Sequence, residues 1–399
     1  MFRSFLKRLT KRPPIRVSVD LTRLGHGGQN GGIKPLVFEF LQWIAAERGS
    51  EFTFIYFTKS SLVPEVEAFR RDSDWQVCVG ESDGMPAPKA KAARAGLVSA
   101  PEPGADWRLR WPADLLYAPL GMSALVQPGL PWISLIVDTL HRDVPGILSP
   151  AETAYRDEWI RDGIANADAV QCISHFVSGQ LQRNFSAPSA KIFVTHCVVN
   201  ARMRAAANSV PKDSSSALPY FFYPANDWPH KNHRALLEAY AAYRREAAAG
   251  AWDLVLSGHF TQPEVWKDLI ASLRLTASCR VLGHVEPQKF AEVFRGAGAL
   301  VFPSLYEGFG IPVLEAMTLG VPVACSRSGS LSEVAGEAAL FFDASSPADI
   351  TRALREISAD AGLQKRLVAA GRRRAEDFAI AKEAGPLADR FAALGRRNR

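Results

Sequence analysis

The stretch from Phe302 to Gly320, FPSLYEGFGIPVLEAMTLG, constrains the fold more than any other part of the chain. An apolar run that ends at Phe302 is typical of a buried strand, and Pro303 breaks it. Pro312 suits the first turn of a helix, and Gly320 suits the residue just after its end. The pattern therefore predicts a strand, a glycine loop and a short helix, as found where open α/β sheets bind their ligands.

Two glutamates, Glu307 and Glu315, lie in the predicted loop and in the following helix. Gly308 and Gly310 flank Phe309 and let a ligand approach the main chain closely. The helix N-terminus offers unpaired N–H groups and a partial positive charge to an anion. Spacing alone leaves a plainer interpretation open, because glutamate is common near helix N-termini and a loop glutamate can simply be solvated.

Length and composition indicate a two-domain globular protein. The chain has 399 residues, of which 47% are hydrophobic and 22% charged, and a formal net charge of +6. This modest positive charge suits an anionic ligand, an anionic membrane or nucleic acid, and it selects none of them.

The cysteine pattern indicates a reducing compartment, and the apolar segments do not indicate insertion into a membrane. The five cysteines are scattered without a C-x-x-C pair, so we expect free, buried thiols. We see no secretory signal. The uncharged segment 115–137 is broken by prolines and glycines, so it predicts short strands rather than a transmembrane helix.

Two further stretches repeat the order of strand, loop and helix. After a predicted strand at 16–21, a glycine-rich loop that includes Gly31 and Gly32 leads into a helix. It matches neither a P-loop nor a clean dinucleotide fingerprint, and a mobile surface loop explains it equally well. The other stretch begins with a predicted strand at 220–223. Lys231 lies just before the helix that follows, where its ammonium group can bind an anion.

Composition also predicts the domain boundaries. Residues 207–219 are rich in serine and proline and form the best linker candidate. We expect a basic amphipathic N-terminal segment (1–13) and an N-terminal Rossmann-like acceptor domain (14–206). After the linker (207–219) we expect a C-terminal Rossmann-like donor domain (220–375) and a last helix that can pack back on the N-terminal domain (376–399). The first segment fits an interfacial membrane helix and a disordered or locally packed terminus equally well.

The sequence PSLYEGFGIPVLEAM resembles the signature of the retaining, nucleotide-sugar-dependent glycosyltransferases of family 4, the glycosyl transferases group 1. The resemblance is strong from Tyr220 to about Phe378 and weaker before it. It implies an α/β protein of the GT-B type, with two Rossmann-like, doubly wound parallel-sheet domains facing a central cleft. It also implies that no metal and no cofactor are required besides the donor substrate.

The resemblance assigns roles by matched position. Glu307 would contact the donor sugar, Glu315 the nucleotide ribose and Lys231 the donor diphosphate. Backbone groups would contact the sugar, the phosphates and the base. The implied donor-binding residues are Gly31, Gly32, Asn226, Lys231, His284, Val285, Glu307, Gly308, Phe309, Gly310, Ile311 and Glu315.

The chain departs from the family pattern at two positions. Asn226 stands where many members carry an arginine on the donor phosphates, and Val137 stands where a histidine is usual. Asp138 and His141 are therefore candidates for contacts with acceptor or sugar, although a structural role suits either at least as well. The candidate catalytic residues are Glu307, Lys231, Asp138 and His141. Ser174 is expected to be an ordinary helix N-cap.

The triplet Asp72-Ser73-Asp74 is formally the metal-binding signature of the other main glycosyltransferase fold. No strand precedes it, and we interpret it as a solvated turn. No metal site is expected.

The expected activity is transfer of a mannose- or glucose-type hexose, with retention, from a GDP- or UDP-sugar to a glycan or lipid-linked acceptor in bacterial surface polysaccharide or lipopolysaccharide synthesis. The expected location is the cytoplasm, with peripheral contact to an anionic inner membrane and no nucleic-acid partner. Two alternatives stay open: a non-catalytic nucleotide- or carbohydrate-binding module of the same fold, and a Rossmann-type oxidoreductase, against which the missing dinucleotide fingerprint argues.

Overall fold

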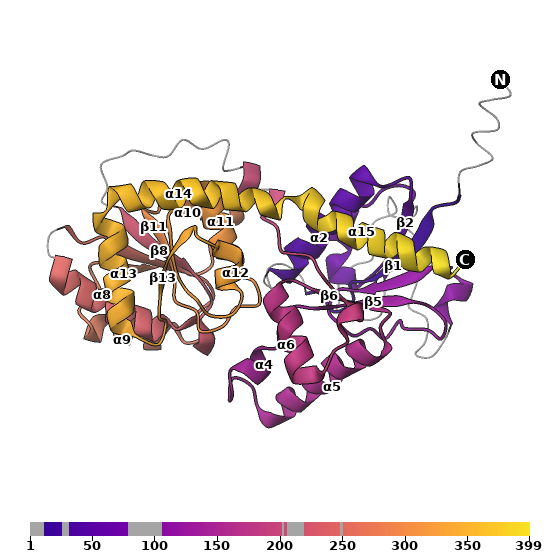
Figure 1. The fold of residues 1–399 in the computed structure, drawn as a ribbon, viewed down its shortest axis with the longest axis horizontal. Coiled ribbons are helices and arrows are strands. Elements are labelled where there is room, and N and C mark those ends of the chain that lie inside the picture. The colour runs from indigo at the N-terminus through magenta and orange to yellow at the C-terminus, as the bar shows by residue number, and fades with distance from the viewer. Residues whose placement is uncertain (1–11, 26–31, 79–105, 202, 206–218, 248–249) are drawn as a thin grey trace, which may run out of the picture.

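The computed structural model describes residues 12–25, 32–78, 106–201, 203–205, 219–247 and 250–399. It consists of two α/β domains that lie side by side along the longest axis of the molecule (Figure 1). The expected N-terminal segment and linker fall mostly outside the described residues.

The first domain is built on a seven-stranded sheet in the order β3-β2-β1-β4-β5-β6-β7. Neighbouring strands pair in parallel, for example Ile15 beside Phe52 and Val17 beside Leu115. Most of its strands are short apolar runs that are almost fully buried, as expected for a parallel sheet covered on both faces. The strands are β1 (Ile15–Asp20), β2 (Phe52–Thr58), β3 (Trp75–Cys78), β4 (Leu115–Ala118), β5 (Trp132–Ile136), β6 (Ala169–Cys172) and β7 (Ile192–Val194).

The second domain repeats this plan with a six-stranded sheet in the order β10-β9-β8-β11-β12-β13. Its strands also pair in parallel, with Ala299 beside Phe221 and Leu300 beside Val323. The strands are β8 (Tyr220–Pro224), β9 (Asp253–Ser257), β10 (Cys279–Val281), β11 (Ala299–Phe302), β12 (Val323–Ser326) and β13 (Ala339–Phe342).

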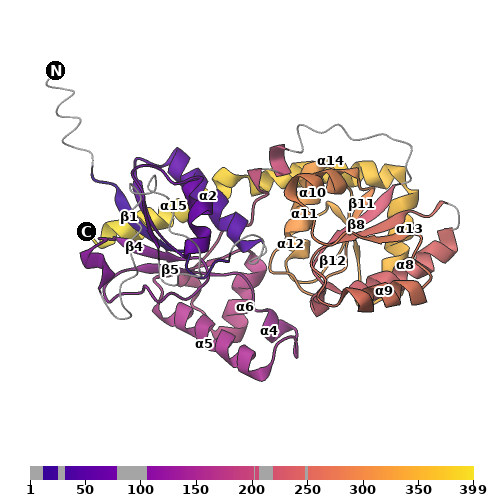
Figure 2. The same cartoon turned by 180° about the vertical axis from the view of Figure 1, so that it is seen from behind.

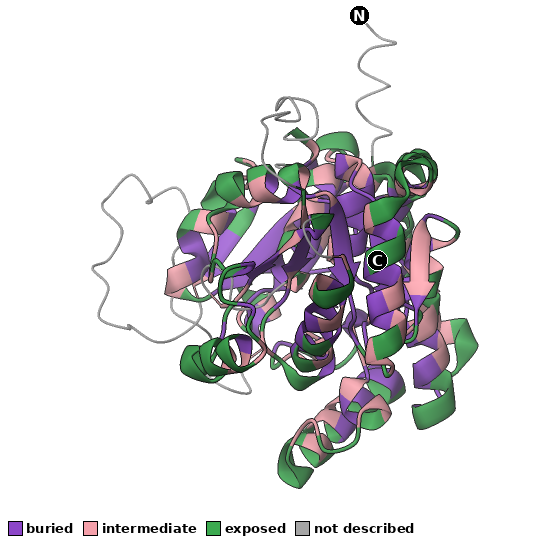
Figure 3. Cartoon of the chain, turned by 90° about the vertical axis from the view of Figure 1, so that its left-hand side faces the viewer, coloured by how far each residue is buried: buried purple, intermediate pink, exposed green. Residues whose placement is uncertain are grey.

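Helices cover both sheets, so that the strands form the buried interior and the helices carry the exposed surface (Figure 3). The first domain contributes α2 (Ile33–Glu47), α3 (Val63–Glu67), α4 (Leu140–Asp143), α5 (Pro150–Asn166) and α6 (His175–Phe185). The second contributes α8 (His233–Ala247), α9 (Pro263–Ser272), α10 (Pro287–Gly296), α11 (Ile311–Leu319), α12 (Leu331–Ala335), α13 (Pro347–Ala359) and α14 (Ala361–Ala375).

The end of the chain crosses from the second domain back to the first (Figure 2). Helix α14 packs on α11, whereas α15 (Ile380–Arg397) packs on α2, β1 and β4 of the first domain. The Phe391 ring on α15 lies 6.1 Å from the Phe52 ring and 5.4 Å from the Tyr117 ring. Such a fully buried side chain contributes about 2–3 kcal/mol, so α15 is an integral part of the first domain's core.

In each sheet the strand order reverses direction between the first and fourth strands of the domain, at β1/β4 and at β8/β11. Ligands of open α/β sheets bind at such switch points, outside the carboxyl ends of the strands. The expected fold class, two doubly wound parallel-sheet domains, is confirmed.

Two smaller expectations also meet the structure. All five cysteines are free; Cys78 is half-buried and the other four are buried. Among the described residues, the search for helices long and apolar enough to span a membrane finds no candidate.

Candidate active site

The centre of the candidate site is an ion pair between Lys231 and Glu307. The Lys231 Nζ atom lies 2.6 Å from Glu307 Oε1, and both side chains are largely buried. Lys231 ends a 3₁₀ turn (Pro229–Lys231) that follows β8, and Glu307 lies in the loop that follows β11. Because β8 and β11 are neighbours at the switch point, the two loops leave the same edge of the sheet side by side.

The loop that carries Glu307 is hydrogen-bonded to Ser330, the N-cap residue of α12. The Glu307 carbonyl oxygen accepts hydrogen bonds from the Ser330 N–H and hydroxyl groups, both at 3.1 Å. Gly310 has φ +95°, a left-handed conformation that suits glycine, and it is the N-cap of α11. The helix N-terminus therefore starts immediately beyond the loop, as the sequence predicts.

The first domain contacts this loop directly. A Cβ atom on Gly308 would lie 2.4 Å from the Val137 carbonyl oxygen, so only glycine permits the observed approach. The Thr139 N–H donates to the Tyr306 hydroxyl at 3.0 Å. Asp138 lies between these contacts, where its Oδ1 accepts from the N–H of Leu140 at 3.0 Å. The end of β5 thus brings Asp138 to the loop of Glu307.

Two more contacts join the domains beside this loop. The hydroxyl of Ser174 donates to the Gly308 carbonyl oxygen at 2.7 Å while it also caps α6. A Cβ on Gly32 would lie 2.4 Å from Ile311 Cδ1, so the predicted first-domain loop meets the start of α11. The cap that was expected at Ser174 is present, but the sequence did not indicate its interdomain bond. Gly31 lies outside the described residues.

Glu315 occupies a distinct environment on α11. It is 7% exposed, and burial raises the pKa of its carboxyl group to about 8. An acidic group that is held neutral near physiological pH in this way is often a functional one. Glu315 therefore differs chemically from Glu307, which has a cationic partner.

Two predicted site residues point elsewhere. The Phe309 ring packs 5.6 Å from the Phe378 ring and 6.0 Å from the His196 ring, so its side chain serves the interdomain core, and its backbone alone remains a candidate contact. The His141 side chain is fully buried, with Nε2 3.1 Å from Asp157 Oδ1. Burial lowers the pKa of His141. His141 thus has the structural role that the sequence analysis left open, because α4 turns its ring toward Asp157 of α5.

Three further donor-binding candidates, Asn226, His284 and Val285, lie in loops of the second domain. Asn226 Oδ1 accepts from the His259 N–H at 2.8 Å, which fixes the side chain against the loop after β9. His284 is exposed and Val285 is half-buried, and both follow β10. They follow β8 and β10 at the same sheet edge as Lys231.

One residue of the site was not singled out from sequence. His230 is 8% exposed, and burial, together with the charge of Lys231, lowers its pKa to about 4. Glu307 and Asp138 oppose that shift, which places His230 among all three charged groups. A neutral imidazole here adds no charge to the cluster. Its position immediately before Lys231 was the available signal.

The triplet at 72–74 needs a correction. Asp74 is buried and not solvated, because Oδ1 accepts from the Phe54 N–H at 3.0 Å and from Arg71 at 2.6 Å. Asp72 is exposed. Asp74 thus anchors β2, which is a structural role.

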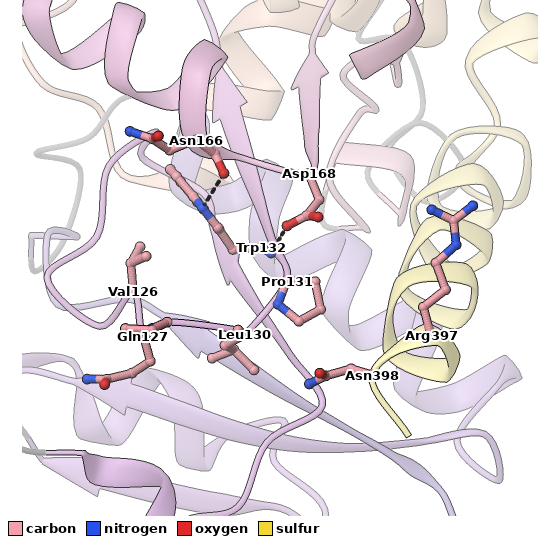
Figure 4. A pocket seen from close by; sticks show the side chains of 11 residues that line it. Val126, Gln127, Leu130, Pro131, Trp132, Asn166, Asp168, Arg397 and Asn398 are labelled. Atoms are coloured by element: carbon pink, nitrogen blue, oxygen red, sulfur yellow. Dashed lines mark hydrogen bonds between the residues drawn. The ribbon is translucent and has the colours of Figure 1, made fainter.

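A separate hollow of about 610 Å³ lies at the opposite end of the first sheet (Figure 4). It includes Trp132, whose backbone N–H donates to the Asp168 carboxylate and whose indole N–H donates to the Asn166 carbonyl oxygen, both at 3.0 Å. Trp132 begins β5, so this hollow faces the amino ends of the strands. It is therefore not the switch-point site.

Comparison with known proteins is consistent with this geometry. A model of the family "Glycosyl transferases group 1" matches residues 208–374. "O-antigen chain mannosyltransferase B" of Escherichia coli is 30% identical over 202 residues, which cover 47% of this chain and 51% of that protein. "D-inositol 3-phosphate glycosyltransferase" of Streptomyces avermitilis is 30% identical over 248 residues, 58% of this chain and 53% of that protein. The chain thus spans about half the length of these two relatives.

Solved structures match the whole two-domain arrangement. A glycosyltransferase from Rickettsia africae superposes with a TM-score of 0.71 at 15% identity, covering 96% of this chain and 99% of that one. HepE of Anabaena, in complex with UDP and glucose, gives 0.69 at 14% identity, covering 95% and 100%. WaaG, a glycosyltransferase involved in lipopolysaccharide biosynthesis, gives 0.67 at 15% identity, covering 94% and 99%.

The two parallel-sheet domains, joined at their switch-point loops, define the GT-B class of glycosyltransferase fold. Within that class, the similarity to the glycosyl transferases group 1 lies in residues 208–374, which include the second domain almost completely.

Proposed function

We propose that this protein transfers a mannose- or glucose-type hexose from a nucleoside-diphosphate sugar to a glycan or lipid-linked acceptor of a bacterial surface polysaccharide or lipopolysaccharide. The observation that carries the proposal is the Lys231–Glu307 pair at the switch point of the second sheet, against the first domain's loop at Asp138. The names of the relatives, which include an O-antigen chain mannosyltransferase, support the class of product.

Lys231 supplies the positive charge that the leaving group needs. Breaking the bond between the anomeric carbon and the phosphate oxygen leaves an anionic nucleoside diphosphate. The Lys231 ammonium group and the N-terminus of α11 stabilise that charge in a partly buried site, where such interactions are strong. No metal ion takes part in this proposal.

Glu307 and Asp138 act on the sugar and the acceptor. Glu307 orients the donor hydroxyl groups and offsets positive charge at the oxocarbenium-like centre. The acceptor hydroxyl attacks the anomeric carbon from the face that the diphosphate leaves, and its proton passes to the departing phosphate oxygen. This same-face reaction retains the anomeric configuration. Asp138 lies on the acceptor side of the loop, paired with Arg156 at 3.2 Å.

Glu315 recognises the nucleotide. We assign its buried carboxyl group to the ribose hydroxyls, since a buried acid gains most from a ligand that satisfies it. The backbone near His284 and Val285 faces the base in this assignment. Asn226 contributes no charge, so Lys231 carries more of the phosphate binding.

We further propose that the enzyme works at the cytoplasmic face of the inner membrane. The proposal rests on the sequence of segment 1–13, most of which lies outside the described residues. The spacing of its apolar residues predicts one helical face, and it contains five basic residues: Arg3, Lys7, Arg8, Lys11 and Arg12. Flotation with anionic vesicles tests it: equal recovery of the full chain and of a variant lacking residues 1–12 would end this part of the proposal.

A donor panel tests the central proposal. Purified protein is incubated with UDP-glucose, GDP-mannose and related donors, with and without EDTA, and release of nucleoside diphosphate is followed. We expect turnover of one donor that persists in EDTA, and a product whose anomeric configuration, read by NMR, matches that of the donor. Loss of turnover in EDTA that added magnesium or manganese restores would refute metal independence, and inversion would refute the same-face reaction.

The same panel separates the alternative classes. A binding module would be stabilised by a nucleotide in a thermal-shift experiment without consuming any donor. A response to NAD and not to UDP, GDP or ADP would favour an oxidoreductase and overturn the proposal.

A further inference from the structure

A second cluster of polar side chains lies where the domains meet, behind the loop of Glu307. It consists of His175, the first residue of α6; His196, in the connection after β7; and Glu333, on α12 of the second domain. One ligand atom from each of the three lies within 4.8 Å of the others. The cluster therefore combines two imidazoles from one domain with a carboxylate from the other.

The His196 ring is oriented by a carboxylate on its far side. Glu383 of α15 accepts from the His196 backbone N–H at 2.6 Å and lies 3.1 Å from Nδ1. With an Nδ1–H group that donates to Glu383, the Nε2 atom is directed toward Glu333. A carboxylate behind an imidazole is the usual support of a metal-ligating histidine.

The Glu333 carboxylate is held by the main chain of the first domain. The N–H groups of His175 and Phe176 donate to its two oxygens at 2.8 and 2.9 Å. Its Oε1 lies 2.9 Å from His196 Nε2. Two ligands of a tetrahedral zinc ion, each about 2.0–2.1 Å from the metal, are separated by about 3.3 Å, so a small opening of this contact would admit the ion.

The third candidate ligand is the side chain of His175. His175 is exposed, and its ring centroid lies 5.5 Å from that of His196. Its ligand atom already lies within 4.8 Å of those of His196 and Glu333, so only a small rotation of this surface side chain would be needed for joint ligation. His196 and Glu333 are half-buried, which leaves one side of the site open to solvent.

We propose that His175, His196 and Glu333 form a binding site for a divalent transition metal of the zinc type. Two imidazoles and one carboxylate suit zinc and are poor ligands for magnesium and calcium, which prefer oxygen. The bound ion links α6 of the first domain to α12 of the second. Because α12 begins beside Ser330, which holds the Glu307 carbonyl oxygen, the ion stabilises the domain arrangement around the loop of Glu307. The site does not depend on the proposed function, and its ion takes no part in sugar transfer.

The competing account is a metal-free ion pair, in which a protonated His196 simply bridges Glu333 and Glu383. Both accounts join the domains, but only the metal site needs His175. His175 makes its hydrogen bond to Glu333 through the backbone, so His175→Ala removes one ligand and leaves the ion pair intact.

The test uses the untagged full chain, stripped with a chelator and dialysed. Zinc chloride is titrated by calorimetry, cobalt(II) is followed by its visible absorption, and the melting temperature is measured with each. We expect one zinc per chain, a raised melting temperature, and binding at least about tenfold weaker in His175→Ala, with a loss of about 10–100-fold in Glu383→Gln. His259→Ala, which removes an exposed histidine outside the cluster, should bind as the wild type does.

Two results would overturn the site. One is a wild-type chain that takes up neither zinc nor cobalt. The other is zinc binding that is equally tight in His175→Ala and His259→Ala, which would place the ion elsewhere. Magnesium chloride at the same concentrations should leave the melting temperature unchanged, and an equal stabilisation by magnesium would contradict the assigned metal class.

Discussion

The Lys231 ammonium group lies 2.6 Å from a carboxylate oxygen of Glu307, although the two residues are 76 positions apart. The strand order brings them together, because β8 and β11 are adjacent at the switch point. In the proposed reaction each group serves a different part of the donor. Lys231 meets the diphosphate, and Glu307 meets the sugar. Their substitutions should therefore separate donor binding from chemistry.

Glu307→Gln should lower the rate of transfer by about 10²–10³-fold, because a contact to the transition state is lost. Its affinity for the nucleoside diphosphate should stay close to that of the wild type, because Lys231 remains. Lys231→Ala should weaken nucleotide binding as well. Calorimetric titration with the nucleoside diphosphate and initial rates with the donor measure the two effects. Asp389→Asn serves as a control, since this exposed carboxylate pairs with Arg48 far from the loop. Equal losses of nucleotide affinity in both site variants would contradict the division of roles.

The buried carboxyl group of Glu315 should make the stability of the protein depend on pH. Burial raises its pKa from 4.5 to about 8, so between these values the folded state binds more protons than the unfolded state does. The contribution of Glu315 to the free energy of unfolding therefore falls as pH rises through this window. Glu315→Gln remains neutral, and it should exceed the wild type in stability at pH 9 by on the order of a few kcal/mol, since one pKa unit corresponds to about 1.4 kcal/mol.

Urea unfolding at pH 5, 7 and 9 measures this difference. At pH 5 the wild-type carboxyl group is protonated in the folded state, so the two proteins should be nearly equally stable. A difference that is constant across pH would show that the substitution acts through packing and not through ionisation.

The sequence predicts the parts of the site that follow strands, and it does so for a physical reason. Short apolar runs before Asn226 and Pro303 identify buried parallel strands, and the residues after such strands must lie at one sheet edge. Lys231, Glu307 and Asp138 are placed correctly at that edge. His141 lies only three residues beyond Asp138, within a short helix, and the sequence pattern does not determine the direction in which that helix points its ring.

The contacts between the domains could not be predicted. His196 is 137 residues from Glu333 and 187 from Glu383, and three separate elements bring them together. Neither periodicity nor a local motif indicates such a cluster. Ser174 shows the same limit, because its capping role is readable from sequence whereas its bond to the Gly308 carbonyl oxygen depends on how the domains meet.

Gly308→Ala should force the domains apart. Its Cβ atom would lie 2.4 Å from the Val137 carbonyl oxygen, a backbone atom that cannot rotate away. We expect a larger radius of gyration by small-angle X-ray scattering and a transfer rate lowered by at least about tenfold, since a misplacement of about 1 Å can cost 10²-fold. Gly385→Ala is the matched control, because its Cβ would meet no atom within 4 Å in the middle of α15. An unchanged radius of gyration together with unchanged transfer would show that the contact is not needed.

Tyr306→Phe should weaken the link between the domains without altering the charges of the site. Its hydroxyl accepts from the buried Thr139 N–H at 3.0 Å, and Thr139 follows Asp138 directly. Removing the acceptor leaves a buried donor without its partner, which costs about 1–3 kcal/mol in the free energy of unfolding. Tyr155→Phe is the control, because the Tyr155 hydroxyl contacts Arg23 at the surface and should contribute about 0–1 kcal/mol. Urea unfolding of both variants measures the difference, and equal stabilities would mean that the Thr139 N–H finds another acceptor when the hydroxyl is gone.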